Sequence, residues 1–454
     1  MVTDSQFLLW ITIWFSIGIV LVVGRSRVKS GVGLVSAFGL QMLILHWLAA
    51  AIYVLPWYWN LDVGVVFAGL KESTYAMGGF TLGVLGLAAV YPRANQVNPI
   101  VRNTVVNRKI VQVYLLVGAA SYFVLAPFFA ATPTLSAVVN TASSCAILGV
   151  ALACWNSDHG RNRGYLWWWI LAAAFLPFVT IAVQGFIGYG LAASVVIFAF
   201  VGSFYRPVWK TVVVSLLASY IGMSLYVTYM RDRQDIRTVV WGGESASARF
   251  NRLRDTFQDL ELFDINNVEH LQRVDLRLNQ NYLVGAAVQS LERRQSEFAY
   301  GETIWEAMLA PIPRAIWPDK PSAAGSGDLV SRFTGIQFAE GTSVGIGQVM
   351  ELYVNFATPG VFVGFIFIGG LLSYVDARAA QYRDAGDWNR FTLWFLPGLS
   401  MLQLGGSFVE LTSTAASAVV VALLLNRFAP RSARIGFSLP EQAPLRPTAI
   451  QRGH

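Results

Sequence analysis

The chain has 454 residues, of which 55% are hydrophobic and only 13% are charged. Because soluble proteins carry about 25% charged residues, this composition excludes an ordinary soluble domain. The net charge of +7 is divided among separate loops, a distribution typical of membrane topology and not of nucleic-acid binding. Cys145 and Cys154 lie in one apolar segment, so we expect neither a disulfide nor a zinc site.

Apolar runs of about 20 residues, the length of a bilayer-crossing helix, recur along the chain. No basic region precedes the first run, so we interpret it as a membrane span and not as a cleavable signal peptide. We predict an all-α integral membrane protein with about eleven transmembrane helices, at residues 7–24, 32–55, 73–91, 111–130, 137–155, 165–183, 189–205, 211–230, 347–374, 391–408 and 411–426.

Basic residues gather in alternate loops, which predicts the orientation of the chain. One set of loops contains most of them, including Arg25, Arg93, Arg108, Arg161, Arg206 and Arg378, whereas the opposite short loops contain little beyond Lys71. The positive-inside rule places the first set in the cytoplasm, the N-terminus outside and the C-terminus inside.

This topology divides the chain into four parts. Residues 1–230 form helices 1–8, residues 231–346 form a large external loop, and residues 347–426 form helices 9–11. Residues 427–454 form a cytoplasmic tail that we expect to be disordered.

The external loop is predicted to contain two amphipathic helices, at residues 246–262 and 266–292. Arg273 and Arg277 lie four residues apart on one face of the second helix, where two guanidinium groups could bind a pyrophosphate. The alternative is that Arg273 pairs with Glu269, which lies four residues before it.

Prolines interrupt regular structure in the segment PIPRAIWPDKP, residues 311–321. The segment contains two cations, Arg314 and Lys320, on a stiffened backbone that could bind an anion. The alternative is a rigid surface loop whose charges are solvated or paired.

The next predicted span carries Gln348, Glu351 and Asn355 on one polar stripe, and Pro359 is predicted to kink it. Ionisable residues inside a span are costly and point to function, so we expect a polar cavity that opens outward. The alternative for Glu351 is a structural hydrogen bond between helices.

The sequence contains no GxxxxGK[ST], no HExxH and no DxD segment. We therefore predict neither a nucleotide cofactor nor a metal. We also predict that the substrate brings its own leaving group to the reaction.

The run Pro313, Arg314, Trp317, Pro318, Lys320 and Pro321, followed by Glu351, Leu352, Tyr353, Asn355 and Phe356, resembles motifs of the Wzy-type O-antigen and exopolysaccharide polymerases. This resemblance covers about residues 300–360. It implies a GT-C-like fold in the bacterial inner membrane, with the large loop in the periplasm. It also implies metal-independent transfer of a glycan from undecaprenyl (polyprenyl) pyrophosphate onto the non-reducing end of another lipid-linked repeat unit.

On that resemblance the site residues take specific roles. Glu351 or Glu340 would accept the proton of the attacking hydroxyl, and Arg273, Arg277, Arg314 and Lys320 would neutralise the pyrophosphate. The glycan would contact Trp317, Tyr353 and Asn355. The partners would be the lipid-linked oligosaccharide, the bilayer and a chain-length-regulating copolymerase.

Two other functions remain open. An O-antigen or glycan ligase would use the same donor with a different acceptor, and a lipid-linked glycan transporter would use a midplane site between repeats.

Overall fold

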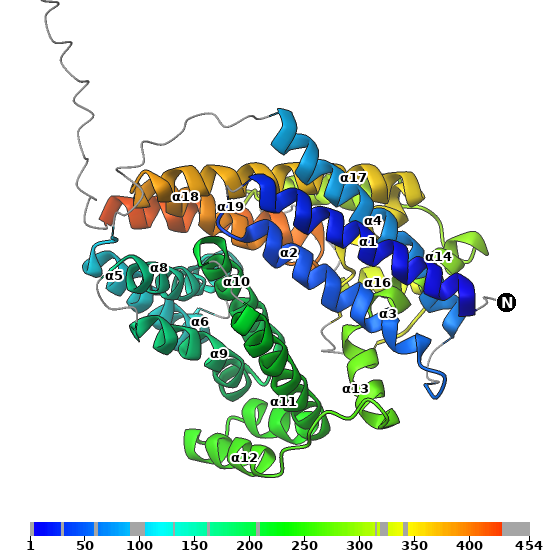
Figure 1. Ribbon diagram of the computed structural model, residues 1–454, viewed down its shortest axis with the longest axis horizontal. Coiled ribbons are helices and arrows are strands. Elements are labelled where there is room, and N and C mark those ends of the chain that lie inside the picture. The colour runs from blue at the N-terminus through cyan, green and yellow to red at the C-terminus, as the bar shows by residue number, and fades with distance from the viewer. Residues whose placement is uncertain are drawn as a thin grey trace, which may run out of the picture.

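The computed structural model describes residues 4–28, 31–58, 62–90, 105–129, 132–160, 164–205, 209–313, 316–317, 326–338 and 344–428. Every regular element in these ranges is helical, as the sequence predicts (Figure 1). The first half contains α1 Asp4–Val28, α2 Leu34–Met42, α3 Ala49–Ala51, α4 Val63–Val90, α5 Arg108–Ala120, α6 Ala126–Phe128, α7 Pro133–Ser143, α8 Cys145–His159, α9 Gly164–Gln184 and α10 Gly188–Phe204. The second half contains α11 Trp209–Trp241, α12 Ala246–Gln258, α13 Val268–Leu278, α14 Gln280–Glu292, α15 Glu302–Leu309, α16 Ser326–Thr334, α17 Gln348–Asp384, α18 Trp388–Ser400 and α19 Phe408–Phe428.

Short π- and 3₁₀-helical turns join some of these helices into longer continuous ones. The π-helical turn Leu43–Leu48 and the 3₁₀ turn Ile52–Val54 continue α2 and α3, and the π-helical turn Ser121–Leu125 connects α5 to α6. Seven helices in the described part are long and apolar enough to cross a membrane: Asp4–Ser26, Leu34–Val54, Arg108–Phe128, Leu135–His159, Gly164–Gln184, Gln348–Asp384 and Phe408–Arg427.

All eleven predicted spans overlap helices, but four lie on helices outside that set of seven. These four are the spans at 73–91 on α4, 189–205 on α10, 211–230 on α11 and 391–408 on α18. Helix α18 ends at Ser400, and the predicted span therefore runs too far. Residues 401–407 instead form a turn that is hydrogen-bonded to the start of α17: Gly347 N donates to Gly405 O, and Gln348 N donates to Leu404 O.

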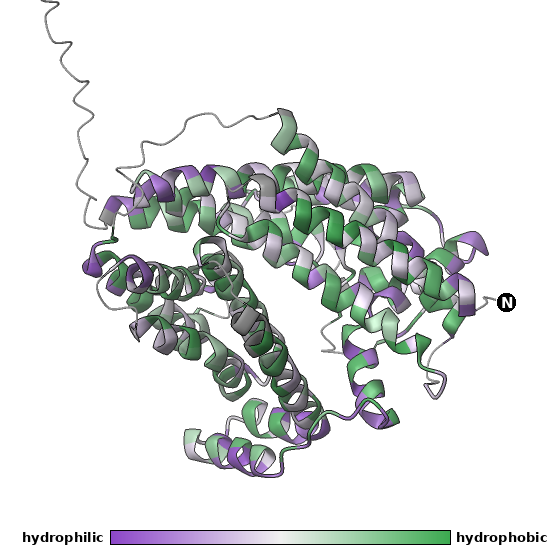
Figure 2. Ribbon diagram, viewed as in Figure 1, coloured by the Kyte–Doolittle hydropathy of each residue, from purple (hydrophilic) through white to green (hydrophobic). Residues whose placement is uncertain are grey.

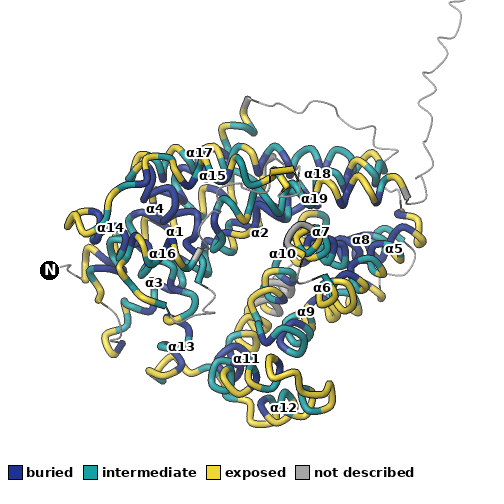
Figure 3. Tube along the Cα trace, turned by 180° about the vertical axis from the view of Figure 1, so that it is seen from behind, coloured by how far each residue is buried: buried dark blue, intermediate teal, exposed yellow. Residues whose placement is uncertain are grey.

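Many hydrophobic residues of the long helices are exposed, as the colouring by hydropathy and by burial indicates (Figures 2 and 3). Val22, Leu116, Phe175 and Phe367 are 58–73% exposed, each on a different candidate span. A protein surrounded by water rarely exposes so much contiguous apolar area, whereas lipid solvates it without cost. The structure therefore agrees with a membrane protein.

The helices form two groups that pack against each other (Figure 1). One group contains α1, α2, α4, α14, α17, α18 and α19, and the other contains α5 to α12. Contacts of α10 with α2, and of α7 with α19, connect them.

Helix α4 is the centre of the first group because glycines let its backbone approach two neighbours. A Cβ on Gly69 would lie 1.9 Å from Asn281 O of α14, and one on Gly285 would lie 1.8 Å from Val65 O. On the other side, a Cβ on Gly79 would lie 2.2 Å from Phe362 O of α17. Small residues permit this close packing of helices in lipid.

The helices in the predicted external loop, residues 231–346, differ from those expected from the sequence. Helix α11 continues without a break through the predicted boundary at residue 230, and the predicted helix 266–292 is interrupted at Asn279. Asn279 ends α13, and its side chain accepts a hydrogen bond from Asn281 N at the start of α14. Helix α14 then packs on α4, so this part of the predicted external loop belongs to the helical bundle.

The glycine contacts predict a sharp difference between two substitutions in α4. Gly69→Ala should lower the free energy of unfolding by about 1–3 kcal/mol, because the methyl group overlaps the α14 backbone. The matched control is Gly86→Ala, where nothing lies within 4 Å of the new Cβ. Thermal unfolding of both variants in detergent measures the difference, and equal stability would contradict the packing of α4 on α14.

Candidate functional site

The predicted polar stripe at the start of α17 is present, but its side chains are engaged in contacts between helices. Glu351 is fully buried, and its Oε2 accepts a hydrogen bond of 2.7 Å from Phe408 N at the start of α19. Its Oε1 is buried with no hydrogen-bond partner in the described part of the chain. Gln348 donates from Nε2 to Gln403 O over 3.2 Å.

Asn355, the third residue of the stripe, joins α17 to the start of α15. Its Oδ1 accepts from Gly301 N over 2.8 Å, and its Nδ2 donates to Thr303 Oγ1 over 2.8 Å. Both ends of the amide are thus used inside the protein. The polar side chains of the stripe therefore form structural hydrogen bonds between helices, which was the alternative interpretation of Glu351 from the sequence.

Helix α17 is interrupted directly after this stripe, at Phe356 and Ala357. Phe356 has φ −140° and ψ 17°, and Ala357 has φ 52° and ψ −161°. Pro359 explains the interruption, because its ring would clash with the carbonyl of Asn355, four residues before it, and it has no N–H to donate to that carbonyl. The predicted kink is confirmed, and Ala357 has a backbone conformation that side chains disfavour, at a cost of about 1–3 kcal/mol.

A polar cavity of about 360 Å³ lies where α4, α14 and α17 meet, beside the interruption. This volume is within the range of about 300–1,000 Å³ that small-molecule sites occupy. Its lining residues are Gly64, Phe67, Ala68, Lys71, Glu72, Tyr75, Val288, Gln289, Glu292, Tyr353 and Thr358. Among the sequence-predicted site residues, Tyr353 lines this cavity.

Glu72 is the most deeply buried charged residue of the cavity, at 6% exposure. Its Oε1 accepts a hydrogen bond of 2.8 Å from Thr358 Oγ1, the residue that follows the interruption of α17. Its Oε2 is buried and has no hydrogen-bond partner in the described ranges. A buried carboxylate oxygen without a partner is costly, so such an atom points to a ligand or a proton.

Lys71 brings a positive charge to the same cavity. Its ammonium lies 5.8 Å from the centroid of the Trp10 ring, and it makes no ion pair with a described residue. Trp10 also makes an edge contact of 5.7 Å with Tyr75. Glu292, the last residue of α14, is exposed at the cavity and adds a second carboxylate. The cavity thus combines one cation, two carboxylates, an amide and two phenols.

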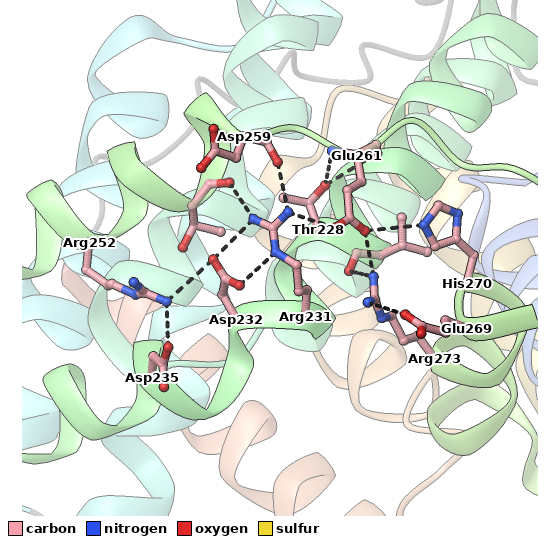
Figure 4. Close-up of polar contacts among 12 residues, drawn as sticks. Thr228, Arg231, Asp232, Asp235, Arg252, Asp259, Glu261, Glu269, His270 and Arg273 are labelled. Carbon is pink, nitrogen blue, oxygen red and sulfur yellow. Dashed lines mark hydrogen bonds and ion pairs between the residues drawn. The ribbon is translucent and has the colours of Figure 1, made fainter. Parts of the chain in front are cut away.

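Arg273, predicted to bind pyrophosphate, belongs to an ion-pair cluster that joins α11 to α13 (Figure 4). Its Nη1 donates to Glu261 Oε2 over 2.7 Å, and its Nη2 lies 3.4 Å from Glu269 Oε2. The pairing with Glu269 that the sequence left open is therefore present. Arg231 donates to the other oxygen of Glu261 over 2.8 Å.

The remaining predicted site residues are scattered or outside the described residues. Arg277 is half-buried and makes no ion pair in the described part. Trp317 is 38% exposed. Arg314, Lys320 and Glu340 lie outside the described residues.

Sequence reasoning missed Glu72, Glu292 and Gln289 as site residues. The available signal was the pair Lys71–Glu72 at the edge of the predicted span 73–91, because ionisable residues at such a position call for a partner. Nothing in the sequence places residues 289 and 292 beside that pair, since the contact depends on how α14 packs on α4.

Comparisons with known proteins assign the chain to a family whose function is unknown. Residues 75–386, more than half of the chain, match the model of a family described as Domain of unknown function (DUF8712). The chain matches no curated protein and no solved structure.

The ion-pair cluster predicts a pH-dependent stability. Partial burial raises the pKa of Glu261, but hydrogen bonds from Arg231 and Arg273 lower it more, so the pKa lies below its ordinary value of 4.5. A carboxyl with a lowered folded pKa stabilises the protein above its unfolded pKa, and this contribution is lost as pH falls through the folded pKa. Glu261→Gln should therefore lower the melting temperature by about 2 °C at neutral pH and by less in acid.

Thermal unfolding in detergent between about pH 7 and pH 3 measures this difference. The matched control is Glu269→Gln, because that side chain is 76% exposed and makes only the longer contact with Arg273. A gap between wild type and Glu261→Gln that stays constant over the whole pH range would refute the assignment.

Proposed function

We propose, for a chain that belongs to the DUF8712 family, the activity of a polysaccharide polymerase. In this proposal the protein transfers a glycan from polyprenyl pyrophosphate to the non-reducing end of another lipid-linked repeat unit. The polar cavity between α4, α14 and α17 is the observation that carries the proposal, because it puts a cation and carboxylates beside Tyr353. Glycosyl transfer from a pyrophosphate needs both kinds of charge.

The side of the membrane that the sequence predicts for the cavity supports this function. Helix α14 belongs to the segment that charge and hydropathy place outside the cytoplasm, and α14 contributes Gln289 and Glu292 to the lining. A cavity on that side would meet a substrate whose lipid is anchored in the outer leaflet. The absence of a P-loop from the sequence agrees, since the leaving group comes with the substrate.

The proposal also retains the finer features expected from the sequence. These are eleven spans, a GT-C-like arrangement, a bacterial inner-membrane location, an external N-terminus and a cytoplasmic C-terminus. Arg277, Arg314 and Lys320 remain candidates to bind the pyrophosphate together with Lys71, whereas the guanidinium of Arg273 is already paired with two carboxylates. A chain-length-regulating copolymerase remains a candidate partner.

The test is a reaction of the purified protein with a polyprenyl pyrophosphate-linked repeat unit from its own host. A gel should show a ladder of repeat-unit multiples, and the ladder should persist in EDTA because the proposed transfer uses no metal. Intact substrate would overturn the polymerase assignment, and transfer only after addition of a second acceptor would establish a ligase. Loss of the ladder in EDTA would contradict the metal-free mechanism.

Arg314→Ala in the same reaction should lose the ladder while the protein keeps its melting temperature, because the developing charge on the pyrophosphate is no longer neutralised. Arg254→Ala is the matched control, since Arg254 is an exposed arginine of the same external segment. Equal ladders from wild type and Arg314→Ala would remove Arg314 from the site.

A further inference from the structure

We infer that Glu72 is the general base that accepts the proton of the acceptor sugar hydroxyl, and that the cavity it lines is the acceptor-sugar site. This inference rests on the proposed function and deepens it. It names a residue and a substrate group that the sequence motifs did not indicate.

A comparison of the two buried carboxylates favours Glu72 over Glu351. Each has one oxygen in a hydrogen bond and one buried oxygen without a partner in the described ranges. Glu351 is bound by the backbone N–H of Phe408, so it holds the start of α19 against α17. Glu72 is bound by a side-chain hydroxyl, and it lines the 360 Å³ cavity. A general base must reach the proton that it removes, and the cavity gives Glu72 a route to a ligand.

The other lining residues suit a sugar. Gln289 can donate and accept hydrogen bonds with hydroxyl groups, as can the phenols of Tyr75 and Tyr353. The ring of Phe67 offers an apolar face against which the C–H groups of a sugar ring can pack. The chemical class that fits this lining is a neutral, polyhydroxylated ring of monosaccharide size.

The proposed step transfers the glycan with every bond and proton accounted for. The acceptor hydroxyl oxygen attacks the anomeric carbon of the donor glycan, and a new C–O glycosidic bond forms. The C–O bond to the pyrophosphate breaks, and its electron pair leaves with the phosphate oxygen. The hydroxyl proton moves to the Glu72 carboxylate. The negative charge that develops on the leaving group is then next to the Lys71 ammonium.

Thr358 is a positioning residue in this scheme. Its hydroxyl donates to Glu72 Oε1 over 2.8 Å, and it occupies that place because α17 is interrupted at Phe356 and Ala357. The bond fixes one carboxylate oxygen and favours the ionised form that a base requires. The ionisable groups that line the cavity with Glu72 are Lys71 and Tyr75 from α4, Glu292 from α14 and Tyr353 from α17.

The experiment compares wild type, Glu72→Gln and Glu72→Asp in the ladder assay, with kcat and KM measured for the host repeat unit. Glu72→Gln should lose kcat by about 10²–10⁴-fold with KM changed only a few-fold, because the amide cannot take the proton. Glu72→Asp should recover part of the rate. The matched control is Glu244→Gln, an exposed glutamate between α11 and α12 that should keep wild-type turnover.

The pH–rate profile separates this role from a structural one. Thr358→Val should move the acidic limb to higher pH, since the carboxylate loses the donor that favours its ionised form. If Glu72→Gln fails to fold, the pH–rate profiles of Glu72→Asp and Thr358→Val provide the test. An acidic limb displaced from that of wild type supports Glu72 as the general base, and acidic limbs identical to wild type overturn this role.

The outcomes distinguish this inference from the proposed function. A ladder from wild type and an equal ladder from folded Glu72→Gln would overturn Glu72 alone. No ladder from wild type would overturn the polymerase function and, with it, the role of Glu72.

Discussion

The close approach of α4 to α14 and α17 is the constraint on which the cavity depends. Gly69 and Gly285 bring α4 against α14, and Gly79 brings it against α17. A side chain at any of these positions would collide with backbone, so the helices would separate and the polar lining would disperse. Because lipid gives helices no hydrophobic reason to associate, this backbone contact is a main source of specific packing in the bundle.

The interruption of α17 also depends on this helix packing. The backbone of Ala357 is strained, and the surrounding helices must hold it in place. What the strain produces is the contact between Thr358 and Glu72. Backbone strain and a buried carboxylate oxygen that no described residue bonds are both typical of functional sites, and here both features border one cavity.

The charged residues around Glu261 and those around Glu72 differ in how far they pair with one another. Around Glu261, arginines and carboxylates satisfy one another, and the result is a joint between α11 and α13. Around Glu72, neither the Lys71 ammonium nor Glu72 Oε2 is paired: within the described part of the chain, the first makes no ion pair and the second no hydrogen bond. Satisfied networks stabilise a fold, whereas unsatisfied charges in a cavity are available to a substrate.

The sequence by itself determined the helical class, the approximate positions of the helices and the kink at Pro359, because apolar run length and proline stereochemistry are local properties. It also predicted that Glu351 and Asn355 lie on one stripe. It could not decide which polar residues share a cavity, because Glu72, Glu292 and Thr358 come from three distant segments. Only the packing of α14 and α17 on α4 brings them together, and only the fold shows that Arg273 is already paired.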